Sequence, residues 1–176
     1  MKVRVLAALV FLTLVPGDAF PQNTVELNRL DEKLARELQK TLPDWKHERG
    51  EPIAGSGDNV LIEWWSASHR KVKVSILLHK SVADAQEVMQ QGARYSFNKE
   101  ILTGLGDEAF AHGYGSSQVT FRRGKFTVYV SAGVDIDADP DAQNLTQERR
   151  FEREKSAMRE LSREFAKRVV DAMDAP

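Results

Sequence analysis

The chain of 176 residues contains no cysteine, and this absence excludes several features. No disulfide can stabilise the fold, and no thiolate is available as a catalytic nucleophile. A bacterial lipid anchor is attached to a cysteine, so we expect none here. Stability must therefore come from a packed hydrophobic core, which a single domain of this length can form without crosslinks.

The chain also has little net charge. It carries 25 Lys and Arg residues against 26 Asp and Glu residues, for a formal net charge of −1 at pH 7. A near-neutral chain has no global field that would steer it toward nucleic acid or an anionic membrane. We therefore expect no nucleic-acid partner. The chain shows no internal repeat and no low-complexity tract, which favours a single domain.

Long apolar runs are also absent, apart from one at the start of the chain. Lys2 and Arg4 precede an apolar run over residues 5–15. The run is too short to span a bilayer, and this arrangement is typical of a secretory signal peptide. We predict a signal peptide over residues 1–19 and a secreted or periplasmic domain over residues 20–176, with no transmembrane anchor after cleavage. An uncleaved N-terminal anchor is the alternative.

Three segments have the apolar spacing of amphipathic helices. Residues 24–42 carry leucines at three- and four-residue steps, and Pro43 ends the pattern. We expect this leucine stripe to pack on the sheet of the same domain, with a partner-binding helix as the alternative. A second helix is predicted over residues 81–97 and a third over residues 144–173. The first half of the third helix is nearly all charged, so we expect it to project into solvent or to meet a protein partner.

Alternating apolar and polar residues predict the strands. One hairpin is expected over residues 60–66 and 71–79, a further strand over residues 108–113, and a second hairpin over residues 118–134. Together with the helices, this order predicts an α+β fold. Its sheet is expected to be mostly antiparallel, with about five strands within residues 60–133 and helices packed on at least one face.

Two adjacent tryptophans, Trp64 and Trp65, lie within the first predicted strand. Successive side chains of a strand point to opposite faces, so one of the two must leave the main core. Either a helix covers this second face, or the tryptophan is exposed and available to a ligand. We favour cover, because burying a side chain of this size stabilises by more than about 1.5 kcal/mol.

The stretch GLGDEA, which begins at Gly104, is rich in glycine. Its glycine spacing fits neither a dinucleotide fingerprint nor a P-loop, and Asp107 and Glu108 would repel a phosphate. We interpret it as a structural turn. Gly104 and Gly106 supply positive φ angles on either side of Leu105, whose side chain returns to the core. Asp107 is expected to brace the turn by accepting hydrogen bonds from backbone N–H groups.

This turn, followed by a strand, the basic turn RRGK and the alternating strand FTVYVS, resembles a pattern in uncharacterised secreted or lipid-anchored bacterial domains. The resemblance covers roughly residues 60–133. It implies an extracytoplasmic α+β domain and implies no reaction. The chain departs from the lipid-anchored members by lacking their lipobox cysteine, which implies a soluble protein.

Arg122, Arg123 and Lys125 form the basic tip of the second predicted hairpin. Together with His69 and its two basic neighbours, they are candidates for a patch that binds anions or acidic glycans. The alternative is that charged tips keep the strand edges from pairing with other chains. With Trp64 and Trp65, these cations complete the candidate binding residues.

Asp135, Asp137 and Asp139 alternate along the chain in a way that suggests a calcium loop. The segment fails the EF-hand template, because Pro140 stands where that template requires glycine and Thr146 where it requires glutamate. A looser calcium site or an acidic linker into the last helix remain the two interpretations. No other cofactor is expected.

Catalytic templates are absent from the sequence. The segment GYGSS does not match the G-x-S-x-G nucleophile motif, and no histidine has a partner that linear spacing identifies. We therefore predict no catalytic residues and a secreted, non-enzymatic binding or interaction module of unknown ligand. The alternatives are a calcium-stabilised domain and a small extracytoplasmic hydrolase, in which Asp107, Glu108 or His112 would meet another polar group in a pocket.

Overall fold

The computed structural model describes residues 21–51 and 58–176, which contain three α-helices and seven strands. The predicted signal peptide, residues 1–19, lies outside the described residues. The elements in chain order are α1 (Pro21–Thr41), β1 (Lys46–Arg49), β2 (Val60–Ala67), β3 (Arg70–Leu78), α2 (Val82–Tyr95), β4 (Glu100–Leu102), β5 (Glu108–His112), β6 (Gln118–Arg123), β7 (Phe126–Val134) and α3 (Gln147–Asp174). In these two ranges no helix combines the length and the apolar character needed to cross a membrane.

All seven strands form one antiparallel sheet in the order β1-β2-β3-β7-β6-β5-β4. The predicted α+β class is confirmed, but the prediction of about five strands is wrong. The two additional strands are the edges, β1 and β4. The sequence of β1, KHER, has no apolar alternation, and β4 has only three residues. β1 is held by backbone pairing to β2, and β4 is too short to show an alternating pattern.

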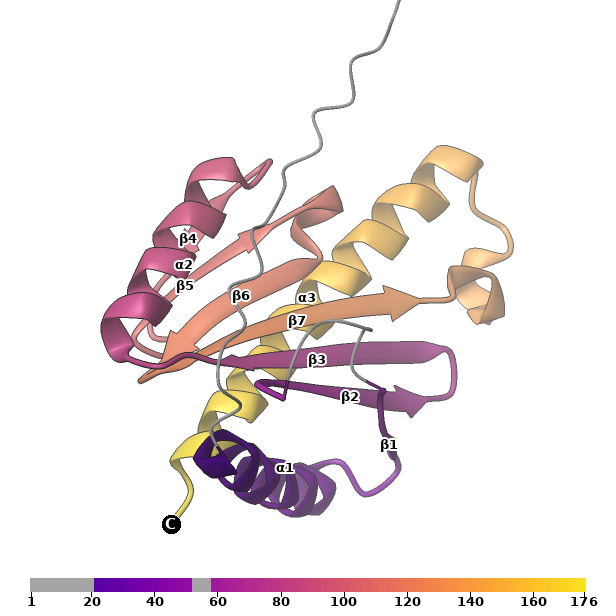
Figure 1. The fold of residues 1–176 in the computed structure, drawn as a ribbon. Helices are drawn as coiled ribbons and strands as arrows, with labels where there is room; N and C mark the ends of the chain where they lie inside the picture. The colour runs from indigo at the N-terminus through magenta and orange to yellow at the C-terminus, as the bar shows by residue number, and fades with distance from the viewer. Residues whose placement is uncertain (1–20, 52–57) are drawn as a thin grey trace, which may run out of the picture.

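One face of the sheet packs against α1 and α3, which also contact each other. The leucine stripe of α1 is buried there, and so are the inward residues of β3 and the second half of α3. The main core includes Leu27, Leu30, Leu34, Leu38, Leu42, Val72, Val74, Ile76, Phe121, Phe165 and Val169. In Figure 1, α3 runs behind β3 and β7. The stripe thus packs within the domain, as expected from its spacing.

α2 packs on the opposite face, mainly over β6 and β7. Its buried residues, Ala85 and Met89, lie outside the main core cluster, as does Phe110 of β5. The helix begins where the sequence predicts, because the Oγ of Ser81 accepts a hydrogen bond of 3.1 Å from the N–H of Asp84. A second, smaller layer therefore covers one end of the sheet (Figure 1).

The long helix α3 begins at Gln147, with Thr146 as its N-cap. Its second half is buried against the sheet, whereas its first half is largely exposed. Phe151 in that first half is 46% exposed and lies edge-on to Tyr114, with ring centroids 5.3 Å apart. The protein partner expected for this helix stays a prediction.

Candidate functional site

The second face of the sheet is only partly covered, because α2 lies over one end of it. The strand pleat alternates side chains, so β2, β3 and β7 each present every second residue to this side. We call the uncovered part of this surface the open face. Its residues include Trp64, Ser66, Lys71, Lys73, Ser75, Tyr129 and Ser131. The helical cover expected over the second tryptophan therefore lies elsewhere, because α2 packs mainly on β6 and β7 and Trp64 is in β2.

Trp64 and Trp65 lie on opposite faces, as the pleat requires. Trp65 is completely buried in the main core. Trp64 is half-buried on the open face, where the Nζ of Lys71 lies 4.3 Å from its ring centroid and the Nζ of Lys73 lies 5.5 Å away. Both distances fall within the range of cation–π attraction. The indole thus forms an aromatic platform bordered by two ammonium groups.

A polar hollow of about 160 Å³ lies beside this platform. Its polar lining consists of Lys73, Ser75, His112, Gln118, Thr120, Tyr129 and Ser131. The Nε2 of His112 lies 2.9 Å from the Oγ1 of Thr120, within hydrogen-bonding distance. Burial lowers the pKa of His112 and raises the pKa of Tyr129, so both side chains are uncharged at neutral pH. The hollow therefore offers neutral hydrogen-bonding groups next to the ammonium group of Lys73.

The open face carries an excess of positive charge around Trp64. Lys46 and Glu48 of β1 form an ion pair of 2.6 Å, which compensates one cation. Lys71 and Lys73 have no carboxylate within ion-pair distance among the residues that the structure describes. Two ammonium groups thus remain available to an anionic ligand.

The predicted basic tip is not part of this surface. Arg123 pairs with Phe126 across the β6–β7 turn, and Phe126 in turn pairs with Leu78 at the far end of β3 from Lys73. Each predicted cation of the tip also has a carboxylate partner. Arg122 pairs with Asp107 and Glu108 at 2.7 and 2.6 Å, Arg123 with Asp107 and Asp174 at 3.0 and 2.8 Å, and Lys125 with Glu26 at 2.6 Å.

The glycine turn has the geometry that the sequence suggests. Gly104 and Gly106 have φ angles of +73° and +60°, and Leu105 is buried in the main core. The Oδ2 of Asp107 accepts a 2.8 Å hydrogen bond from the N–H of Gly124, at the tip of the neighbouring hairpin. Partial burial raises the pKa of Asp107, but this hydrogen bond and the nearby arginines outweigh it and lower the pKa below its usual value. Asp107 therefore joins two turns as an ionised brace.

Replacing Asp107 with alanine should lower the free energy of unfolding by about 2 kcal/mol. The substitution leaves the buried guanidinium of Arg122 with one carboxylate fewer and the N–H of Gly124 without its acceptor. Urea unfolding measures the loss. Asp141→Ala is the matched control, because that side chain is 85% exposed, and its effect should stay within about 0.5 kcal/mol. Equal unfolding midpoints for the two variants would contradict the brace.

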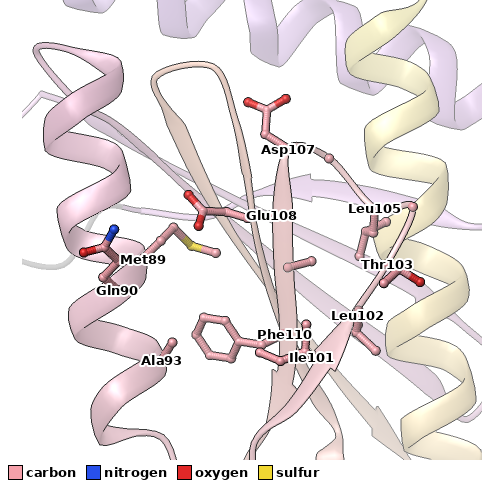
Figure 2. A pocket seen from close by; sticks show the side chains of 13 residues that line it. Met89, Gln90, Ala93, Ile101, Leu102, Thr103, Leu105, Asp107, Glu108 and Phe110 are labelled. Carbon is pink, nitrogen blue, oxygen red and sulfur yellow. The ribbon is translucent and has the colours of Figure 1, made fainter.

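A cavity of about 480 Å³ lies between α2 and the β4–β5 corner (Figure 2). Figure 2 shows Met89 and Ala93 of α2 on the side that faces Phe110. The lining includes Asp107 and Glu108 but not His112, and both carboxylates are engaged by Arg122. His112 lies instead in the polar hollow, beside Thr120 and Tyr129, so the hydrolase alternative stays a prediction.

The alternating aspartates lie in the two short 3₁₀ turns between β7 and α3. Asp135 and Asp139 each accept a hydrogen bond from the backbone N–H two residues further on, at 3.2 and 3.0 Å. Asp137 pairs with Arg150 at 3.0 Å, and Asp139 with Arg153 at 2.8 Å. The calcium site stays a prediction, in competition with these turn and helix contacts.

Sequence reasoning missed one group of ionisable residues, formed by Asp31 of α1, His47 of β1 and Glu63 of β2. Each residue offers one ligand atom, and the three atoms lie within 4.8 Å of one another. Glu63 is completely buried, and burial raises its pKa to about 8. The one available signal was the acidic residue in the otherwise apolar run VLIEWW, at a position that shares its face with Trp65.

Comparison with family models, with curated proteins and with solved structures gives no match for this chain. The resemblance to secreted bacterial domains with a G-L-G-D-E-A turn therefore stays a prediction. The site is consequently argued from its own geometry.

Proposed function

We propose that the protein is an extracytoplasmic, non-enzymatic binding module that holds an acidic glycan on the open face of its sheet. The observation that supports this function is the half-buried Trp64, flanked by Lys71 and Lys73 and adjoined by the polar hollow. The extracytoplasmic location rests on the predicted signal peptide over residues 1–19.

An acidic glycan matches the three chemical components of this surface. One face of a sugar ring presents C–H groups, which complement the face of an indole such as that of Trp64. Ring carboxylates complement the ammonium groups of Lys71 and Lys73. Hydroxyl groups complement the neutral donors and acceptors of the hollow, including Gln118 and Tyr129.

The lining of the hollow supports binding without turnover. Glycoside hydrolysis normally requires a pair of carboxyl groups at a set separation, and no carboxylate lines the hollow among the described residues. His112, its one imidazole, is hydrogen-bonded to Thr120. The composition of the hollow therefore favours positioning of a glycan over its cleavage.

Affinity electrophoresis through gels that contain polygalacturonate, a uronic acid polymer, tests the proposal. The wild-type protein should be retarded by this polymer and not by neutral dextran. Trp64→Ala and Lys73→Ala should each weaken binding about tenfold, which corresponds to about 1.4 kcal/mol. Added salt should reduce the retardation, because the lysine contacts are solvent-exposed.

The matched control is Phe151→Ala, which removes an exposed aromatic side chain at a distance from the open face. This variant should bind like the wild type. Either of two results would defeat the proposal: a wild-type protein that migrates equally in both gels, or equal losses from Phe151→Ala and Trp64→Ala.

A further inference from the structure

Three elements bring ligand-type side chains together inside the domain, on the face of the sheet opposite the open face. Asp31 comes from α1, His47 from the edge strand β1 and Glu63 from β2. Register pairs His47 with Trp65, the residue two positions after Glu63, so both His47 and Glu63 point toward the helical layer. The Nε2 of His47 lies 3.7 Å from the Oε2 of Glu63.

Two polar atoms in this cluster lack the partner that buried polar atoms normally have. The Oε1 of Glu63 and the Nε2 of His47 are both buried without a hydrogen-bond partner among the described residues. Glu63 itself has no solvent exposure. Leaving such groups unpaired inside a protein is costly, so two orphaned atoms in one cluster indicate that something else satisfies them.

We infer that Asp31, His47 and Glu63 bind a divalent transition-metal ion of the zinc type. Zinc accepts imidazole nitrogen and carboxylate oxygen together, and three protein ligands leave a fourth position for water. Ligand atoms around such an ion lie about 3.4 Å apart at bond lengths near 2.1 Å. The present separations of up to 4.8 Å would have to shorten, which requires a small rotation of the partly exposed Asp31 and His47 side chains.

The donor set favours zinc over calcium. Calcium requires six to eight oxygen ligands, and imidazole is not among its ligands in proteins. Imidazole suits zinc, copper, iron and nickel, and one or two carboxylates complete such sites. This site is also distinct from the predicted calcium loop, which lies between β7 and α3.

Neighbouring residues restrict the orientation of the three ligands. The indole N–H of Trp65 donates a 3.0 Å hydrogen bond to the Oε2 of Glu63, and the same ring stacks on His47 with centroids 4.4 Å apart. Arg49 pairs with Asp31 at 2.9 Å. Outer contacts of this kind orient metal ligands and tune their basicity. Each of the three ligands therefore has an outer contact of the kind found around bound metal ions.

Titration of the chelator-stripped protein with zinc tests the inference, with calorimetry for stoichiometry and affinity and thermal unfolding for stability. We expect one zinc ion per chain. At a hundredfold excess over Kd, zinc should raise the Tm by roughly 5 °C or more. Calcium at the same concentration should show no binding that depends on these three residues.

Two variants assign the binding to these residues. His47→Ala and Glu63→Gln should each weaken zinc binding by roughly 100-fold or more, since the loss of an outer contact alone costs up to that amount. The isosteric Glu63→Gln keeps the test valid if His47→Ala unfolds the protein. His69→Ala is the matched control, because that histidine is exposed in the β2–β3 turn. It should bind zinc like the wild type.

The inference is overturned if the wild type binds no zinc stoichiometrically, or if binding survives both ligand substitutions. Trp64→Ala should leave zinc binding unchanged, so failure of the metal site and failure of the glycan surface are separately observable.

Discussion

Gly106→Ala is expected to lower the free energy of unfolding by about 3 kcal/mol or more, whereas Gly104→Ala should cost only about 1 kcal/mol. Both glycines have positive φ angles, so the backbone strain of an alanine is similar at the two positions. The difference lies in the space around the added Cβ. At position 106 it would lie 2.5 Å from the backbone oxygen of Arg122, and at position 104 it meets nothing within 4 Å.

The clash at position 106 falls on a backbone atom that already has a structural role. The oxygen of Arg122 accepts a 2.8 Å hydrogen bond from the N–H of Asp107, which anchors the glycine turn to β6. Backbone atoms cannot rotate aside as a side chain can, so the turn and β6 must separate. Urea unfolding of the two variants measures the difference, and similar losses for both would contradict this close approach.

Glu63→Gln is expected to change the pH dependence of stability in the metal-free protein. Burial is the main cause that raises the pKa of Glu63, from 4.5 to about 8. The folded state therefore keeps a proton that the unfolded state releases. The stabilising contribution is complete below the unfolded pKa near 4.5 and is lost as the pH rises through about 8. Glutamine cannot ionise, so the variant should not show this loss.

The expected result is a difference between variant and wild type that grows with pH. The free energy of unfolding of Glu63→Gln, relative to that of the wild type, should rise by about 1.4 kcal/mol per pH unit between pH 4.5 and 8. The total rise should be roughly 4 to 5 kcal/mol. Comparing the two proteins cancels the titration of ionisable groups that are distant from Glu63. Urea unfolding from pH 5 to 9 in the presence of a chelator measures the difference. A gap that stays constant over this range would show that Glu63 is ionised in the folded protein throughout.

Periodic segments of the sequence were the predictable part of the fold. The leucine stripe of α1 recurs at helical spacing, and the apolar residues of β3 and β7 recur at every second position. Helix and strand can therefore be told apart from the spacing of buried residues alone. The edge strand β1 could not be predicted, because it pairs through its backbone and its side chains are all polar. Arg122 shows a third limit. The tight turn pairs it with Thr127 within the sheet, which buries a residue whose sequence context suggests an exposed tip.

The candidate site was predictable only where it depends on residues that are adjacent in the sequence. The pleat separates Trp64 from Trp65 whatever the fold. Which of the two tryptophans lies on the open face depends on where α1, α2 and α3 pack, and this packing is set by tertiary structure. The cluster around Glu63 was out of reach for the same reason. Asp31 and His47 are separated from Glu63 by long stretches of chain, and they meet it only because α1 and β1 pack beside β2.

The central claim is that a glycan binds on the open face at Trp64, and the indole N–H signals of the protein test it most directly. The chain has three tryptophans, Trp45, Trp64 and Trp65, so a ¹H–¹⁵N spectrum contains three indole signals, which single Trp→Phe variants assign. Titration with uronic acid oligosaccharides should shift the signal of Trp64 and leave that of the buried Trp65 in place. Zinc should do the reverse, since Trp65 donates to Glu63. A Trp64 signal that stays unmoved at saturating oligosaccharide would contradict the proposed binding surface.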